Sequence, residues 1–530
     1  MEKKIRYIFI VIVLFTLVLP VIQAFAKGTP KDTIIIACQF DNNITLDPAK
    51  SYDLLSIEYA MNTYDRLMAC DTHDFYKING AAAKSWSISK SGKIFTFNIH
   101  KGISFASGNP LTAYDAAFSL HRLIILNRLS ALSQLGFNPD NVKQKIRAKD
   151  KYTLIMETDR KYSPNLLLRC LTSSASSIVD KKEVMKHEEN NDMGSKWLKT
   201  NYAGSGPYKL RQLKHGESIF LDKNDIYWGN RPIMEKITIR HIADPSTRLM
   251  LVNFGEVDIA RDTGSEQAKK LAGKPNLKIK TLAKGCLYYI GMNQKNNILS
   301  NPKVRLALKY LVDYKNIAKN ILKNNVLIHQ SFFPKTFAKN NQENPFKLDI
   351  EKAKSMLDQA GYKQGFNISI NVLCDLPFTD IAAALQPSFA KAGIKLEINY
   401  MDQAAFIDSY KSRKHELYLG CWGANFQSPE TNAFAFAWNI DNSDKAFNKN
   451  PAWCNAWEIP ELSKKTERFF AESDHEKKAG LYKDLQKEHQ EISPFIIMFQ
   501  KTETAVIKSI IKGFDSDPGF GSSYQYISKE

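Results

Sequence analysis

The chain has 530 residues, with 73 Lys and Arg against 55 Asp and Glu, so its formal net charge is +18. At roughly 100–200 residues per domain, this length predicts two or three domains, each able to bury a hydrophobic core. A charged fraction of 24% and an aromatic fraction of 11% are ordinary for globular proteins and exclude a wholly disordered chain or a coiled coil. Beyond residue 26, no apolar run approaches the roughly 20 residues needed to cross a bilayer, which excludes a polytopic membrane protein.

Residues 1–26 are predicted to be a cleaved signal peptide. Basic residues precede Tyr7, the run from Tyr7 to Leu19 is almost wholly apolar, and Ala24-Phe25-Ala26 has the small-x-small pattern that signal peptidase reads. An uncleaved anchor helix is the alternative, but the apolar run is short for a membrane span. No cysteine ends the run, so a lipoprotein anchor is not indicated. We therefore expect an exported protein that begins at Lys27 and has no stable membrane insertion.

The positive charge does not by itself indicate a polyanion site. The Lys residues are scattered along the chain with no dense basic tract, a distribution typical of a solvated surface. Export also argues against a nucleic-acid partner.

All seven cysteines lie beyond the signal segment, and their spacing contains no CxxC metal or redox pair. In an oxidising compartment some cysteines are expected to pair, and the odd number leaves at least one free. Cys421 with Cys454 is the candidate bridge, although the sequence alone leaves the pairing open.

Helix-like and strand-like segments alternate along the mature chain, which predicts an α/β protein. Thr33–Ala37 is a short apolar run suited to a buried strand. Phe95, Phe97 and Ile99 alternate with polar residues, the period of a half-buried strand. Next, Thr112 and Asp115 fit a capping box that opens a helix continuing through Leu123.

The same rhythm continues in the second half of the chain. Asn301-Pro302 reads as an N-cap followed by a first-turn proline, and it predicts a helix from there. Ile350–Ala360 and Ile381–Ala392 are predicted helices, each followed by a glycine. From Ile394 to Tyr400, apolar and polar residues alternate as in a strand.

The sequence carries no clear sign of catalysis. It contains no HExxH zinc helix, no GxSxG nucleophile elbow and no GxxxxGK[ST] phosphate loop. Gly204–Tyr208 is glycine-rich, but a proline and an aromatic residue follow at once, which favours a tight turn over a phosphate site. We expect no enzyme activity, no metal site and no cofactor, although catalytic triads can assemble from distant residues.

The segment Leu419–Glu430 is the candidate ligand site. It begins as an apolar strand and breaks into small residues flanked by Trp422 and Phe426, then ends at a proline turn. Small residues allow another backbone to lie alongside a strand end, and the aromatic residues offer flat apolar walls. A strand–turn whose Trp belongs to the core explains the pattern equally well.

Six motifs, in the order in which they occur, resemble those of the bacterial extracellular solute-binding proteins that serve peptide, oligopeptide and nickel ABC importers. The family patterns are TLDPA, FxLRkGVkFhdGxPlTAeDV, GTGPY, GevDi, kvRqAlsyAiD and ekAkaLLaeAGY. The matching segments are Thr45–Ala49, Phe95–Asp115, Gly204–Tyr208, Gly255–Ile259, Lys303–Asp313 and Glu351–Tyr362.

The resemblance implies a periplasmic-binding-protein-like fold, with two α/β lobes around a ligand crevice plus a small extra domain. The implied boundaries are 27–60, 180–275 and 490–530 for a discontinuous lobe I, 61–179 for the small extra domain, and 276–489 for lobe II.

The resemblance also implies a set of ligand-binding residues. Cys421–Pro429 aligns with the family pattern GWxADYxxP, in which strand backbone groups pair with a peptide and an Asp holds its α-ammonium group. Asn425 stands at that Asp position, and a neutral amide cannot neutralise a buried cation. The expected roles are backbone partners for Cys421 and Gly423, apolar walls for Trp422 and Phe426, a polar anchor for Asn425, and crevice-facing positions on the other lobe for Phe40 and Asp41.

A second departure concerns the ligand carboxylate. Dipeptide-specific members of the family hold it with an Arg in the stretch that corresponds to 374–403, which contains no Arg here, and Asp380 stands in its place. The motifs that define the scaffold therefore match the family, whereas two of the positions that bind a peptide's charged ends do not.

The resemblance implies the periplasmic substrate-binding component of an ABC importer in a Gram-negative cell. The protein would be a monomer that binds short peptides between its lobes and delivers them to an inner-membrane permease. One alternative keeps the fold but changes the ligand to an N-blocked or cyclic peptide, a sugar or opine conjugate, haem or a metal chelate. The others are a secreted interaction or chaperone protein and an exported hydrolase.

Overall fold

A computed structural model describes residues 28–40, 44–51, 53–71, 77–126, 131–335, 343–423, 429–446, 448–472, 474–514 and 523–530. The predicted signal peptide, residues 1–26, lies outside them. Within the described part of the chain, no helix combines the length and the apolar character that crossing a membrane requires.

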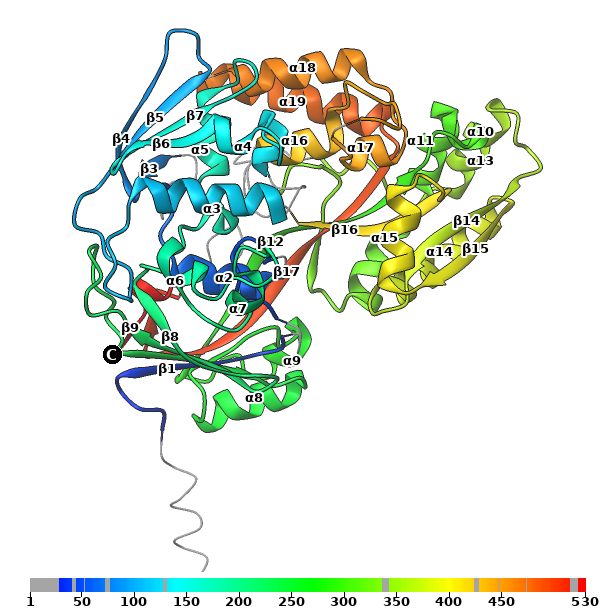
Figure 1. The fold of residues 1–530 in the computed structure, drawn as a ribbon. Coiled ribbons are helices and arrows are strands. Elements are labelled where there is room, and N and C mark those ends of the chain that lie inside the picture. Colours follow the sequence, from blue (N-terminus) through cyan, green and yellow to red (C-terminus); the bar gives the residue numbers. More distant parts are fainter. Residues whose placement is uncertain are drawn as a thin grey trace, which may run out of the picture.

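One large mixed sheet passes through the molecule, in the order β15-β14-β16-β12-β17-β11-β1-β10-β9-β8, with β13 added on β17. β12 and β17 are its longest strands, and Figure 1 shows them running from one part of the molecule to the other. The strands are β1 Thr33–Cys38, β8 Tyr208–Lys214, β9 Ser218–Lys223, β10 Lys236–His241, β11 Ile259–Ala260, β12 Leu277–Met292, β13 Val326–Ile328, β14 Phe366–Leu373, β15 Ile394–Met401, β16 Leu417–Gly423 and β17 Phe495–Lys508.

The first part of the molecule is built around β1, which pairs in parallel with both β10 and β11. Ile34, Ile36 and Ile239 are fully buried in its core, because these strands are covered on both faces. The predicted strand at Thr33–Ala37 is therefore confirmed, one residue longer than expected. Its helices are α2 Leu54–Thr63, α6 Lys181–Met185, α7 Ser195–Leu198, α8 Pro245–Phe254 and α9 Ser265–Lys269.

A separate four-stranded antiparallel sheet, in the order β4-β5-β7-β6, has its own hydrophobic core (Figure 1). One half of the predicted capping box is present, since the Thr112 backbone N–H donates to the Asp115 carboxylate at 2.9 Å where α3 begins, while the Thr112 hydroxyl donates to the same carboxylate. The elements here are β2 Met68–Cys70, β3 Ile78–Gly80, β4 Ala83–Ile88, β5 Ile94–Ile99, α3 Ala113–Leu126, α4 Val142–Lys145, β6 Ile146–Asp150, β7 Thr153–Glu157 and α5 Pro164–Cys170.

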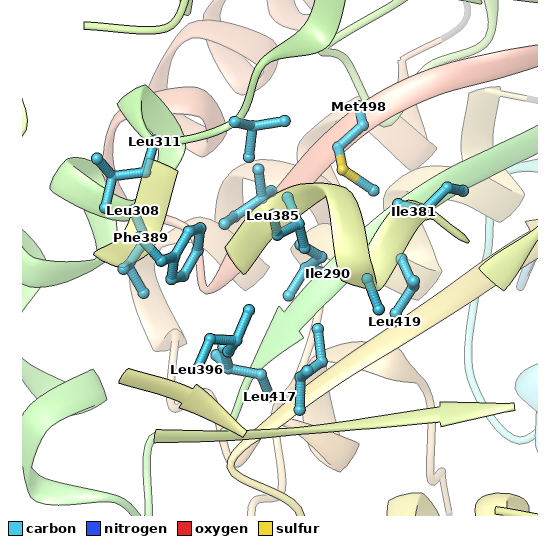
Figure 2. Close-up of a cluster of buried hydrophobic side chains, with 14 of the residues drawn as sticks. Ile290, Leu308, Leu311, Ile381, Leu385, Phe389, Leu396, Leu417, Leu419 and Met498 are labelled. Atoms are coloured by element: carbon cyan, nitrogen blue, oxygen red, sulfur yellow. The ribbon is translucent and has the colours of Figure 1, made fainter. Parts of the chain in front are cut away.

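The second part packs helices onto β14, β15 and β16. Figure 2 shows Ile381, Leu385 and Phe389 of α14 facing Leu417 and Leu419 of β16, all of them buried. α14 begins at Phe378, three residues before the prediction, directly after Pro377. The helices are α10 Asn297–Ser300, α11 Pro302–Tyr310, α12 Tyr314–Asn316, α13 Ile350–Gln359, α14 Phe378–Lys391 and α15 Gln403–Lys411.

Four further helices lie between these parts, above β16 in Figure 1. Two ion pairs join them to the four-stranded sheet domain. Glu430 lies 4.0 Å from Arg169 and Glu467 lies 3.4 Å from Arg160. The helices are α16 Pro429–Ala437, α17 Pro451–Cys454, α18 Pro460–Ala471 and α19 His475–Ile492. The Glu430–Arg169 pair is buried, so it bridges two regions far apart in the chain.

The motifs behind the family resemblance serve the architecture. Asp47 of the TLDPA segment is fully buried and forms an ion pair with Arg122 at 2.9 Å. Asp258 of the GEVDI segment accepts a hydrogen bond from the Ile35 backbone and pairs with Lys508 and Lys529 at the chain's C-terminal end. Such buried charges are tolerated only when they are paired, which explains why these positions are acidic.

Candidate functional site

The end of β16 has one unpaired edge. Antiparallel pairing with β12 continues to Gly423, which lies opposite Cys286. On the other side, parallel pairing with β14 reaches only Leu419 in the described part of the chain. The strand from Gly420 to Gly423 therefore offers backbone donors and acceptors for which the described residues supply no second strand.

Three of the predicted ligand-binding residues occupy this free edge. Cys421 and Gly423 are exposed, and Trp422, between them, is half-buried. The Trp422 ring meets Phe436 of α16 edge-on, with the ring centroids 5.9 Å apart. Its indole Nε1 is buried and has no hydrogen-bond partner among the described residues. Such a donor is costly to leave unpaired.

The structure does not place the other predicted ligand-binding residues at this edge. Asp41, Asn425 and Phe426 lie outside the described residues. Phe40 is buried in the core of the first part, 7% exposed, with its ring 4.8 Å from that of His241. Its role as a ligand contact stays a prediction.

The expected Cys421–Cys454 bridge is wrong. Both cysteines are free, and Cys454 is buried in α17 against Trp453. The sulfur that contacts Cys421 belongs to Cys286 of β12, through a thiol–thiol hydrogen bond. Sequence spacing had no means of showing this pair, because only the register between β12 and β16 brings the two residues together.

The two thiols of this pair differ in pKa. The hydrogen bond from Cys421 lowers the pKa of Cys286 to about 7, with Lys501 and Lys284 contributing positive charge against the effect of burial. The same hydrogen bond raises the pKa of Cys421. One thiolate at the free edge of β16 is therefore accessible near neutral pH.

Lys501 of β17 and Asp262 are the charged groups that sequence reasoning missed. Burial disfavours the Lys501 ammonium, but Asp262, both cysteines and Glu503 outweigh this and raise its pKa. Asp262 follows β11, is exposed, and has a φ of 47°, a conformation that non-glycine residues rarely adopt. Its backbone carbonyl accepts a hydrogen bond from Arg248 at 2.6 Å, which helps to hold this conformation.

Beneath these groups lies a buried network of four charges. Arg261 donates to Glu503 at 2.7 Å and pairs with Glu58 at 2.8 Å, and Lys284 pairs with Glu503 at 2.8 Å. Burial opposes ionisation of Glu503, but Arg261 and Lys284 hold its pKa well below the ordinary range. The network joins α2, β11, β12 and β17 and anchors the strands that carry the site.

Among the described residues, this region shows no metal centre. Across the described ranges, no three His, Cys, Asp or Glu side chains gather to hold a metal ion. A hollow of about 120 Å³ lies elsewhere, at the other end of β12 and β17, where Lys278, Lys280, Ile507 and Phe514 help to line it.

Comparison with known proteins gives the same scaffold. Residues 77–443 match the model of the bacterial extracellular solute-binding proteins, family 5. The chain is 25% identical to the probable D,D-dipeptide-binding periplasmic protein of Escherichia coli K12 over 93% of each chain.

Solved structures share the fold over nearly the whole chain. A Helicobacter pylori periplasmic binding protein in complex with the peptide STSA has a TM-score of 0.76 at 24% identity, over 96% of this chain and 100% of that one. A binding protein from A. tumefaciens R10 in complex with agropinic acid also has a TM-score of 0.76, at 21% identity, over 94% of this chain and 100% of its own. The α/β fold, the order of the motifs and the family match together show that the chain belongs to the bacterial extracellular solute-binding proteins of family 5.

Proposed function

We propose that this protein is the periplasmic substrate-binding component of an ABC importer and that it binds short peptides. The observation that carries the proposal is the free edge of β16 from Gly420 to Gly423. An extended peptide can add to such an edge as a further strand, through main-chain hydrogen bonds that do not depend on its sequence.

Side chains around the free edge support the same ligand class. Trp422 supplies an aromatic wall, and its unpaired Nε1–H is a donor for a ligand carbonyl. Lys501 is a cation suited to a ligand carboxylate, and Asp262 is an exposed carboxylate suited to an ammonium group. A free peptide carries both of these charges.

The roles expected from the sequence for the site residues remain part of this proposal. Cys421 and Gly423 act as backbone partners, Trp422 and Phe426 as walls, and Asn425 as a polar anchor. Asn425 cannot neutralise a ligand ammonium, so Asp262 takes over that charge.

The hydrophobic cores support the domain organisation that we propose. One core joins residues 34–64 to 179–259 and 505–527 and also includes Phe118, a second lies within 67–178, and a third joins 288–419 to 496–499. We assign these to lobe I, the small extra domain and lobe II. Closure of the lobes around the ligand would present the complex to an inner-membrane permease. A monomer exported by its signal peptide suffices for this role, and no catalysis is required.

A non-peptide ligand is the second candidate. Asn425 in place of the family's Asp favours it, and the structural relative that binds agropinic acid shows that the fold accepts an opine. Both candidates use the same free edge and differ in whether the ligand has a free amine.

Mass spectrometry of small molecules released by denaturing the periplasmic protein tests the proposal. A set of free-amine peptides would support it. One defined non-peptide or N-blocked species would favour the second candidate. Recovery of no small molecule, together with no stabilisation by any peptide in a thermal-shift screen, would contradict the peptide proposal, and no stabilisation by opines in the same screen would also contradict the second candidate.

A further inference from the structure

Cys286 and Cys421 lie on the same face of the sheet, on neighbouring strands. Cys286 is opposite Gly423 and Tyr288 is opposite Cys421, so the two cysteines are diagonal neighbours in the antiparallel pair. Gly423 has no side chain, and a Cβ there would lie 2.8 Å from the Cys286 Sγ. The Cys286 sulfur therefore lies over β16, where it meets the Cys421 thiol.

Both sulfurs are within reach of a small reagent. Cys421 is exposed and Cys286 is half-buried. The remaining cysteines differ from this pair. Cys38, Cys170 and Cys454 are buried, Cys70 donates to Thr172 at 3.6 Å, and Cys374 is exposed after the end of β14.

We propose that Cys286 and Cys421 are a modification site, a dithiol that converts reversibly to a disulfide across β12 and β16 by exchange with a small-molecule disulfide. Their register places both side chains on one face of the sheet, and an exported protein meets such oxidants. Diagonal neighbours are normally about 7–8 Å apart, whereas disulfides prefer Cα atoms about 4.4–6.8 Å apart. Closing the bond therefore draws the strands together, and a bond under such strain is readily reduced.

The exchange proceeds in two balanced steps. The Cys286 thiolate attacks one sulfur of the reagent, forms a mixed disulfide and releases one thiolate. Cys421 then loses its proton and attacks the Cys286 sulfur, which forms the internal bond and releases the second thiol. The protein loses two electrons and two protons, and the reagent gains them. Lys501 and Lys284 favour the first thiolate through their positive charge.

The consequence for transport rests on the proposed function. The bond would tie Cys421 to β12 at the point where β14 no longer supports β16. The free edge that accepts the ligand strand would then have two chemical states, one with two thiols and one with a disulfide.

The test needs no ligand, so its failure would leave the proposed function untouched. The full, folded mature protein is reduced, incubated with oxidised glutathione at neutral pH, trapped with an alkylating reagent and analysed by intact mass and peptide mapping. We expect two fewer alkylated cysteines, a cross-linked peptide pair containing Cys286 and Cys421, and full recovery of both thiols with a reductant.

Matched variants identify the pair. Cys421→Ser should stop at a glutathione adduct on Cys286, Cys286→Ser should form no internal bond, and Cys374→Ser should behave as the wild type. The proposal is overturned if the wild type keeps both thiols or stops at glutathione adducts, or if the cross-link persists in Cys286→Ser. The wild-type peptide map decides the question even if a variant fails to fold.

Discussion

The Glu503 carboxylate on β17 lies 2.7 Å from the Nε of Arg261, and both side chains are more than nine-tenths buried. Arg261 follows β11 in the first part of the molecule, whereas Glu503 lies on a strand that runs into the second part. The pair therefore ties the first part of the molecule to the strands that carry the candidate site.

Replacement of Glu503 by Gln should destabilise the protein by about 3 kcal/mol, because it removes the carboxylate that pairs with buried Lys284 and leaves buried Arg261 with Glu58 alone. Urea denaturation at neutral pH measures the change. Glu351→Gln is the matched control, since its pair with Lys354 is exposed and should contribute less than about 0.5 kcal/mol. Equal effects of the two substitutions would contradict the role of the network.

The same pair predicts a loss of stability in acid. The folded-state pKa of Glu503 lies below that of the unfolded chain, about 4.3, so its contribution is complete above that pH and is lost as the pH falls towards the folded value. The difference in unfolding free energy between wild type and Glu503→Gln should therefore shrink below about pH 4. A difference that is constant from pH 7 to pH 3 would show that the carboxylate is not preferentially ionised in the folded protein.

Lys309 of α11 predicts a rise of stability with pH as well, but in the alkaline range. Its ammonium is buried, donates to the Gln490 carbonyl at 2.7 Å, and has its pKa lowered to about 7 by burial and by Arg305. Unfolded Lys has a pKa of about 10.4, so the unfolded chain binds more protons between these values and stability should rise from about pH 7 to pH 10. In Lys309→Met this part of the rise should vanish, whereas the exposed Lys303→Met should retain it. Denaturation curves at several pH values measure both.

Trp422 should contribute to ligand affinity. Trp422→Ala should weaken binding of the recovered ligand by at least about 1 kcal/mol, as loss of an aromatic wall does. Trp422→Phe keeps a ring but removes the Nε1–H, so an intermediate loss would identify that donor as a ligand contact. Calorimetry gives the affinities. The control is Trp197→Ala in α7, which removes a ring that stacks on His187. An unchanged dissociation constant in a folded Trp422→Ala protein would mean that Trp422 is a core residue and not a ligand contact.

The charge at the ligand amine can be tested at two positions. Asn425→Asp should strengthen binding of free-amine peptides, and Asp262→Asn should weaken it by about 1.5–3 kcal/mol, the range for hydrogen bonds to charged groups. N-acetylated peptides should respond to neither change, and Asp140→Asn should have no effect. If calorimetry shows the same shift for free and acetylated peptides, neither residue contacts the amine.

Much of the architecture was readable in the sequence because it depends on local chemistry. The Thr112–Asp115 capping box, the Asn301 N-cap and the alternation through β5 each involve residues within a few positions of one another. Boundaries were less certain, as α14 shows, because its first turn follows from how the chain leaves Pro377. The alternation at Ile394–Tyr400 also weakened at its end, since β15 is an edge strand and Tyr400 is exposed.

The sequence by itself determined the α/β class, the order of the family motifs and the apolar strand with which the segment Leu419–Glu430 begins. Only the tertiary structure decided that the pairing of β14 with β16 stops at Leu419 and that Cys286 rather than Cys454 contacts Cys421. It also decided that the charges of Asp262 and of the two cysteines act on Lys501. The physical reason is that local patterns specify how a segment folds, whereas a site depends on the register between strands that are more than a hundred residues apart in the chain.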